Sequence, residues 1–261
     1  MLQFCSLYSS SEGNCFYVQG QNTRILIDAG VSLKKIEEAL SHINVNIESI
    51  DAVLVTHEHT DHSKSLGTIS KKYNIPIYAN EKTWAVLPAQ KEKILIENQK
   101  HFTPETMFSL GDLTIFPFRT PHDAACPCGF NITCNETKIS VATDLGHITP
   151  TIIKSLENSS FVLLESNYDT EVLRCCSYPY SLKTRISGPS GHLSNTDASK
   201  TIVKLMNSGL KEVMLGHLSK ESNFPELAYQ TVVEEINTQT NLKIPIHIAS
   251  KSEPSEVLHI A

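Results

Sequence analysis

Ligand-type side chains are concentrated in the segment His57-Glu58-His59-Thr60-Asp61-His62. This segment follows the apolar run Val53-Leu54-Val55, whose β-branched residues predict a buried strand. His57 and His59 are two residues apart, so in an extended segment they point the same way, and the next turn can bring Asp61 and His62 toward a second point. Imidazole and carboxylate groups are ligands that suit zinc, manganese or iron. The pattern predicts a metal site, because a merely histidine-rich polar loop does not explain the strand directly before it.

Three further ligand candidates lie downstream, each after a segment predicted as a strand: His122, Asp144 and His217. A histidine at the end of a strand repeats the arrangement at His57. A carboxylate at such a place can use both oxygens and bridge two cations. The alternative for Asp144 is an ordinary helix N-cap.

Strands and helices alternate along most of the chain, which predicts an α/β fold. Period-two and apolar runs predict strands at 2–6, 14–18, 23–28, 53–55, 75–79, 113–119, 130–134, 138–142, 161–164 and 244–249. Helical spacing predicts helices at 32–40, 63–73, 82–87, 150–157 and 225–236, with another opening near Thr196. The lone Trp84 is predicted to be a packing residue.

The length and the 40% of hydrophobic residues suit one large domain about as well as two small ones, and we expect a single domain, 1–261. The formal net charge of −6 argues against a broad basic face, so nucleic-acid binding would have to be local. The chain has no run of 18 apolar residues and no basic stretch followed by an apolar core, which predicts no membrane segment and a cytoplasmic location. The seven irregularly spaced cysteines favour reduced thiols, and Cys126-Pro127-Cys128 lacks the second pair that a metal site would need.

The HxHxDH segment resembles the signature of the metallo-β-lactamase fold superfamily. The resemblance implies an α/β fold of the four-layer αββα sandwich type and two divalent metal ions, either Zn, Mn or Fe. The first ion would be held by His57, His59 and His122, and the second by Asp61, His62 and His217, with Asp144 bridging both. Such a site makes hydroxide available at neutral pH, and Asp61 could accept its proton.

Two further carboxylate and imidazole side chains, Glu165 and His192, lie between Asp144 and His217. This arrangement is similar to that of RNase Z-type nucleases, in which it implies a proton-donating histidine oriented by the glutamate. A nuclease needs a proton donor because an alkoxide is a poor leaving group. Asp144 stands where zinc β-lactamases generally use cysteine, so the likeness is not to the antibiotic-degrading classes.

Longer motifs at 7–15, 187–195 and 217–228 resemble the YycJ/VicX (WalJ) proteins, and the likeness spans nearly the whole chain. It implies a 5′ to 3′ DNA exonuclease whose partner is nucleic acid, at DNA 5′ ends. Backbone and hydroxyl groups of two small-residue loops are expected to hold phosphate. The residues expected to do so are Ser10, Ser11, Asn14, Ser194 and Asn195. Lys64, Lys183, Arg185 and Lys200 are candidates to track the DNA backbone, or are solvated surface charges.

Two other functions remain open at the level of sequence. One is a small-molecule phosphodiesterase or a glyoxalase II-like thioester hydrolase, which needs no proton donor because a thiolate leaves unaided. The other is a regulatory binding module that keeps metals for folding. The oligomeric state is also open.

Overall fold

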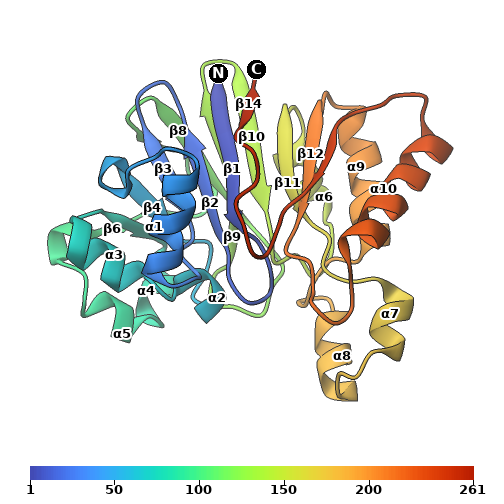
Figure 1. The fold of residues 1–261 in the computed structure, drawn as a ribbon, viewed down its shortest axis with the longest axis horizontal. Coiled ribbons are helices and arrows are strands. Elements are labelled where there is room, and N and C mark those ends of the chain that lie inside the picture. Colours follow the sequence, from blue (N-terminus) through green and yellow to red (C-terminus); the bar gives the residue numbers. More distant parts are fainter.

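Two mixed sheets of seven strands lie face to face in the computed structural model, which describes residues 1–261 apart from the side chain of Pro88 (Figure 1). The first sheet has the order β14 (Leu258–Ile260), β1 (Leu2–Tyr8), β2 (Cys15–Gln19), β3 (Arg24–Ile27), β4 (Ala52–Leu54), β5 (Ile77–Ala79) and β6 (Gln99–His101). The second has the order β13 (Ile246–Ile248), β12 (Glu212–Gly216), β11 (Phe161–Glu165), β10 (Thr137–Ala142), β9 (Cys128–Cys134), β8 (Leu113–Arg119) and β7 (Phe108–Leu110).

Helices cover the outer face of each sheet (Figure 1). Beside the first sheet lie α1 (Leu33–His42), α3 (Leu66–Tyr73), α4 (Glu81–Ala85) and α5 (Pro88–Lys91). Beside the second lie α6 (Pro150–Leu156), α9 (Asn195–Met206) and α10 (Pro225–Gln239). Short helices α2 (Thr60–Ser63), α7 (Thr170–Cys175) and α8 (Tyr180–Ile186) lie at the edge opposite the two termini, and 3-10 turns occupy Ile47–Ser49 and Ile96–Asn98. The predicted αββα sandwich is confirmed.

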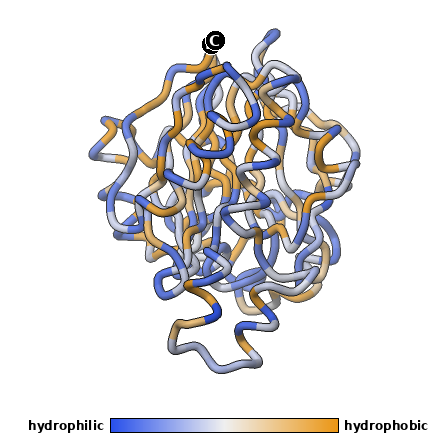
Figure 2. Tube along the Cα trace, turned by 90° about the vertical axis from the view of Figure 1, so that its right-hand side faces the viewer, coloured by the Kyte–Doolittle hydropathy of each residue, from blue (hydrophilic) through white to orange (hydrophobic). Residues whose placement is uncertain are grey.

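The apolar core forms three layers, one between the sheets and one under each set of helices. Between the sheets, Phe4 of β1 and Phe161 of β11 bring their ring centroids to 4.7 Å. Figure 2 shows the same arrangement, with hydrophobic segments along the central strands and hydrophilic ones outside. Trp84 is buried beneath the first sheet, as predicted. Across the described residues, no helix combines the length and the apolar composition that a membrane span requires.

Parallel pairing places several strand ends at one edge of the molecule. Strand β3 runs parallel to β4, and β10, β11 and β12 run parallel to one another. Asp28, Asp144 and His217 follow β3, β10 and β12, and their φ angles are 63°, 58° and 56°. Residues other than glycine adopt this left-handed region at a cost, and such strain gathers at functional sites. The backbone therefore turns sharply where each of these side chains leaves its sheet.

Several boundaries differ from the sequence prediction. The helix predicted at 63–73 begins only at Leu66, as α3, because Ser65 leaves helical geometry with a φ of −108°. Ser63 instead ends the separate short helix α2. The helix predicted at 82–87 ends earlier, and Pro88 begins a helix, since its fixed φ suits the first turn. The strands β6, β7 and β14 were not predicted, because each is a short edge strand of mostly exposed or half-buried residues and lacks an apolar run. Helices α7 and α8 were also missed.

Candidate metal centre

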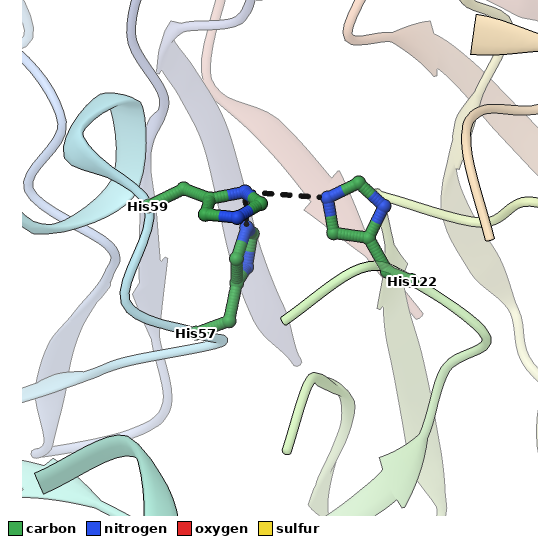
Figure 3. Close-up of side chains that lie close together, drawn as sticks. All are labelled: His57, His59 and His122. Carbon is green, nitrogen blue, oxygen red and sulfur yellow. Dashed lines mark hydrogen bonds between the residues drawn. The ribbon is translucent and has the colours of Figure 1, made fainter. Parts of the chain in front are cut away.

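Three of the predicted ligands, His57, His59 and His122, face one another, as Figure 3 shows. His59 Nδ1 lies 3.1 Å from His57 Nε2 and 3.3 Å from His122 Nε2. Tetrahedral zinc with bonds of 2.0 to 2.1 Å would separate neighbouring nitrogen ligands by about 3.3 Å. His122 donates through Nδ1 to the carbonyl oxygen of Gly191 at 2.9 Å, which leaves its Nε2 lone pair facing the group. The three nitrogens therefore fit a single cation.

A second group lies beside the first and contains Asp61, His62 and His217. Asp61 Oδ2 is 3.2 Å from His62 Nε2 and 3.7 Å from His217 Nε2. One carboxylate and two imidazoles are again a donor set that suits zinc, manganese or iron. The ligand atoms of this group all lie within 4.8 Å of one another, which is the spacing of a shared cation.

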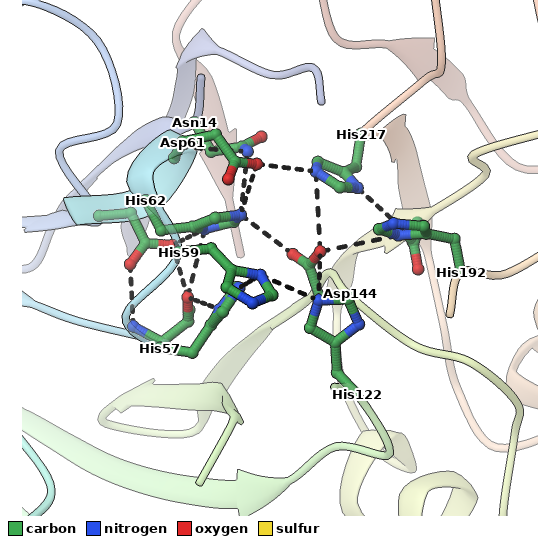
Figure 4. A network of polar contacts seen from close by, with 12 residues as sticks. Asn14, His57, His59, Asp61, His62, His122, Asp144, His192 and His217 are labelled. Atoms are coloured by element: carbon green, nitrogen blue, oxygen red, sulfur yellow. Dashed lines mark hydrogen bonds and ion pairs between the residues drawn. The ribbon is translucent and has the colours of Figure 1, made fainter. Parts of the chain in front are cut away.

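Asp144 stands between the two groups (Figure 4). Its Oδ1 is 3.4 Å from His122 Nε2 and its Oδ2 is 3.2 Å from His62 Nε2, so each oxygen faces a different group. Among the described residues, His217 Nε2 has no hydrogen-bond partner and Asp144 Oδ2 has only the ion-pair contact with His62, although both atoms are buried. A buried polar atom without a partner is costly, and a bound cation would satisfy both. The residues therefore fit two divalent ions that share Asp144.

A carboxylate that the sequence analysis did not identify, Asp28, orients the second group. It is fully buried at the end of β3 and accepts a hydrogen bond from His62 Nδ1 at 2.7 Å. It also accepts from the backbone N–H and the hydroxyl of Thr56, both at 2.8 Å. The Thr56 hydroxyl lies 3.0 Å from His57 Nδ1. Asp28 thus fixes a histidine in one group directly and supports a histidine in the other through Thr56.

Replacing Asp28 by alanine is expected to weaken metal binding about 10- to 100-fold, the usual effect of losing a residue that orients a metal-binding histidine. The comparison is a Zn²⁺ or Mn²⁺ titration of the apo proteins, followed by calorimetry. Asp51→Ala is a suitable control, because Asp51 is an exposed aspartate. It directly precedes β4, whereas the candidate ligand His57 follows that strand. Unchanged affinity in a folded Asp28→Ala protein would contradict the role assigned to Asp28.

Glu165, at the end of β11, holds two histidines at once. Its Oε1 accepts from His192 Nδ1 at 2.8 Å and from His217 Nδ1 at 2.7 Å. Its Oε2 accepts from the backbone N–H groups of Leu145 at 2.7 Å and Leu193 at 3.1 Å. Burial raises the pKa of Glu165, but its contacts with His192 and His217 outweigh burial and leave that pKa below the usual value. Glu165 therefore connects the three loops that carry Leu145, His192 and His217.

His192 is more exposed than His62 and His217, the two histidines of the second group. Its side chain is 13% exposed, against 1% for His217 and 0% for His62. Its Nδ1 is held by Glu165 and lies 3.7 Å from Asp144 Oδ1. In the described part of the chain, no hydrogen-bond partner is recorded for its Nε2. The ring therefore stands at the solvent side of the site, with Nδ1 held by Glu165 and Nε2 open to a substrate.

The carboxylates of the centre favour protonation of two of its histidines. Burial lowers the pKa of His217, but Asp144, Asp61 and Glu165 overcome this and raise it to about 10. The pKa of His62 is likewise raised well above its usual value despite burial. Burial and the nearby His62 charge lower the pKa of His57, which favours the neutral imidazole. Divalent ions would replace these protons, so metal binding should release them.

The predicted phosphate-binding residues of the first loop lie beside the centre. Asn14 is fully buried, donates to the carbonyl oxygen of Ser10 at 2.9 Å, and its Nδ2 lies 3.1 Å from His62 Nε2. The Ser10 hydroxyl accepts from the Glu12 backbone N–H at 3.1 Å. Ser11 is exposed. Asn14 therefore fixes the loop against His62, and Ser11 is the member whose hydroxyl faces solvent.

The phosphate-binding residues predicted in the second loop are engaged inside the protein. Ser194 caps α9 by accepting from the Asp197 backbone N–H at 3.0 Å. Asn195 is fully buried and bonds to Ser166 at 2.6 Å and to Asn223 at 2.8 Å. These bonds hold the loop that carries His192. A direct phosphate contact by either side chain stays a prediction.

The basic residues singled out in the sequence are distributed around the site rather than gathered in it. Arg185 forms two bonds to Asp123, at 2.6 and 3.1 Å, next to His122. Lys183 donates to the carbonyl oxygen of Arg174, whereas Lys64 and Lys200 are exposed. Cys126 and Cys128 are buried, and among the described residues neither belongs to a metal-type group.

Comparisons with known proteins agree with this geometry. Residues 23–217 match the family described as a beta-lactamase superfamily domain. The chain is 38% identical to exodeoxyribonuclease WalJ of Streptococcus pneumoniae serotype 2, over 90% of this chain and 88% of that protein. It is 33% identical to exodeoxyribonuclease YycJ of Bacillus anthracis, over 99% of both chains.

A solved structure shares the fold at low identity. The metallo-beta-lactamase fold protein YhfI from Bacillus subtilis aligns with a TM-score of 0.71 and 18% identity, covering 97% of this chain and 98% of that one. This likeness concerns the fold alone, whereas the two relatives named above share sequence along nearly the whole chain. The protein therefore belongs to the metallo-β-lactamase fold superfamily and, within it, to the family of the WalJ and YycJ proteins.

Proposed function

We propose that this protein is a metal-dependent DNA exonuclease that removes nucleotides from the 5′ end. The observation that carries the proposal is the position of His192, fixed by Glu165 at the open side of two ligand groups joined by Asp144. A proton donor beside a dinuclear centre suits cleavage of a phosphodiester, whose alkoxide leaving group needs a proton. The two close relatives are both named exodeoxyribonucleases.

The two ions would be held as the donor groups indicate. His57, His59 and His122 would hold one, Asp61, His62 and His217 the other, and Asp144 would contact both. Ions in such a pair lower the pKa of water toward neutrality and neutralise charge on a scissile phosphate. Zinc, manganese and iron are all consistent with these ligand types.

Protons would move through side chains that the structure leaves accessible. His192 would donate from Nε2 to the O3′ of the departing nucleotide, while Glu165 keeps its Nδ1 in place. The Asp61 carboxylate is 24% exposed, and its pKa stays below the usual value because His62 and His217 outweigh the effect of burial. Asp61 is therefore ionised, as a proton acceptor must be, and its partly exposed carboxylate would receive the proton of an attacking water.

The proposed polarity rests on two loops that meet the centre from opposite sheets. Asn14 brings the first loop to His62, and His192 brings the second to Asp144. Backbone N–H groups of such loops can hold a terminal 5′ phosphate.

We also propose that 1–261 is one domain, because β14 near the C-terminus pairs with β1 and the two sheets share one core layer.

The polarity is tested with linear duplex and single-stranded DNA labelled at either the 5′ or the 3′ end, in buffer containing Mn²⁺. A 5′ label should appear at once as a mononucleotide, whereas a 3′ label should remain on progressively shorter strands. Early release of the 3′ label would contradict the polarity while leaving a dinuclear phosphodiesterase in place.

Two controls separate the proposal from its alternatives. Covalently closed circular DNA should survive, because it offers no end. A thioester such as S-lactoylglutathione and a β-lactam should not be hydrolysed at a comparable rate. Metal-loaded protein that cleaves none of these substrates would favour a regulatory binding module instead.

A further inference from the structure

A cavity of about 390 Å³ opens beside the metal centre on the side of His217. The link to the centre runs through two lining residues: Ser9, whose hydroxyl accepts from the His217 backbone N–H at 2.8 Å, and Leu218, which follows His217 in the chain. The remaining walls come from the loop before α10 and from the segment after β13. The volume lies in the range of small-molecule sites. A strand that reaches the metals from this side would pass over it.

The walls combine an apolar interior with cationic side chains. Leu218, Ile248 and Phe224 contribute apolar surface, and Phe224 is 48% exposed. Large aromatic side chains in nucleic-acid sites serve as stacking surfaces, because every base has a π-face. A nucleobase stacked on Phe224 would explain why this aromatic side chain is exposed at a cavity beside the metal centre.

Two lysines, Lys220 and Lys251, line the same cavity in a protein whose net charge is −6. Both are exposed. Lys220 lies 3.6 Å from Glu12, a solvated pair that contributes little to stability. A phosphate can therefore exchange with the Glu12 carboxylate at low cost. Bases and phosphates alternate along a DNA strand, so a base in the cavity would bring its neighbouring phosphates close to the two lysines.

We propose that this cavity binds one nucleotide of the DNA strand near the scissile bond, with its base on Phe224 and its flanking phosphates at Lys220 and Lys251. The inference rests on the proposed exonuclease function and adds a subsite to it. A subsite away from the reacting phosphate holds ground state and transition state alike, so its loss raises KM and leaves kcat nearly unchanged.

The test is a scan with 5′-phosphorylated single strands that carry one abasic nucleotide at successive positions from the 5′ end. Wild-type protein should show one position at which the missing base lowers kcat/KM by about 5- to 100-fold, the range expected for base stacking on an aromatic. Phe224→Ala should lower kcat/KM on intact DNA by a similar factor, through KM. In that variant the abasic nucleotide should cause almost no further loss at the same position.

Tyr229→Ala is the matched control, since Tyr229 is an exposed aromatic of α10 outside the cavity. It should keep the wild-type abasic profile. An abasic penalty that is equally large in Phe224→Ala, or the absence of any position-specific penalty in wild type, would overturn the subsite. Wild-type degradation of intact DNA in the same assay tests the exonuclease proposal separately, and failure there would overturn both.

Discussion

Asp144→Ala should lose activity and metal together. In the structure Asp144 lies between the two ligand groups, with Oδ2 at 3.2 Å from His62 and Oδ1 at 3.4 Å from His122. Removing it leaves two cations without a shared anionic ligand, so their mutual repulsion is less screened. Metal content should fall from about two equivalents per chain to one or fewer. Losing a residue that only orients a ligand lowers activity by up to about 100-fold. Exonuclease activity should fall by more than this in Asp144→Ala.

Elemental analysis of gently purified protein measures the loss directly, with circular dichroism to verify folding. Asp144→Asn retains the shape but can ligate through only one oxygen, so it should keep at least one ion and little activity. Chelation of wild-type protein should reproduce the inactive state, and added Mn²⁺ should restore wild type but not Asp144→Ala. Full occupancy of both ions in Asp144→Ala would show that the carboxylate does not bridge.

The candidate metal ligands could be predicted because their positions depend on local rules. A polar residue at the end of a buried strand emerges at a sheet edge, and parallel strands share that edge. Those rules, together with the family resemblance, predicted the seven ligand candidates, and the structure gathers His57, Asp144 and His217 with the rest at one place. The αββα layers followed from the same alternation of strands and helices.

The groups behind the ligands could not be predicted in the same way. Asp28 meets His62 across 34 residues of sequence, and Glu165 meets His217 across 52. Such contacts depend on the register and pairing of strands, which no local pattern encodes. The resemblance pointed to Glu165 as a partner of His192 but not to its second bond. Asn14 and Asn195 were predicted to bind phosphate because they belong to two small-residue loops. Both are fully buried and organise those loops, and a phosphate contact by either stays a prediction.

Replacing His192 by alanine should leave both metals in place and lower kcat on DNA by about 10²- to 10⁴-fold, the usual contribution of a general acid. His192 lies at the open side of the centre, and its Nδ1 is fixed by Glu165 at 2.8 Å. Its ring is 13% exposed, so alanine leaves a solvent-filled gap rather than a buried cavity. His147→Ala is the control, because His147 is an exposed histidine on the neighbouring loop that bonds only to the Pro189 carbonyl oxygen among the described residues.

A substrate with a leaving group that needs no proton separates proton donation from a structural role. The p-nitrophenyl ester of thymidine 5′-phosphate releases a nitrophenolate, which departs without protonation. His192→Ala should therefore cleave this ester at nearly the wild-type rate while remaining slow on DNA. Equal losses on both substrates, with metal content unchanged, would mean that His192 positions the phosphate instead. Loss of a metal ion in His192→Ala would make it a ligand, as its place beside Asp144, Glu165 and His217 also allows.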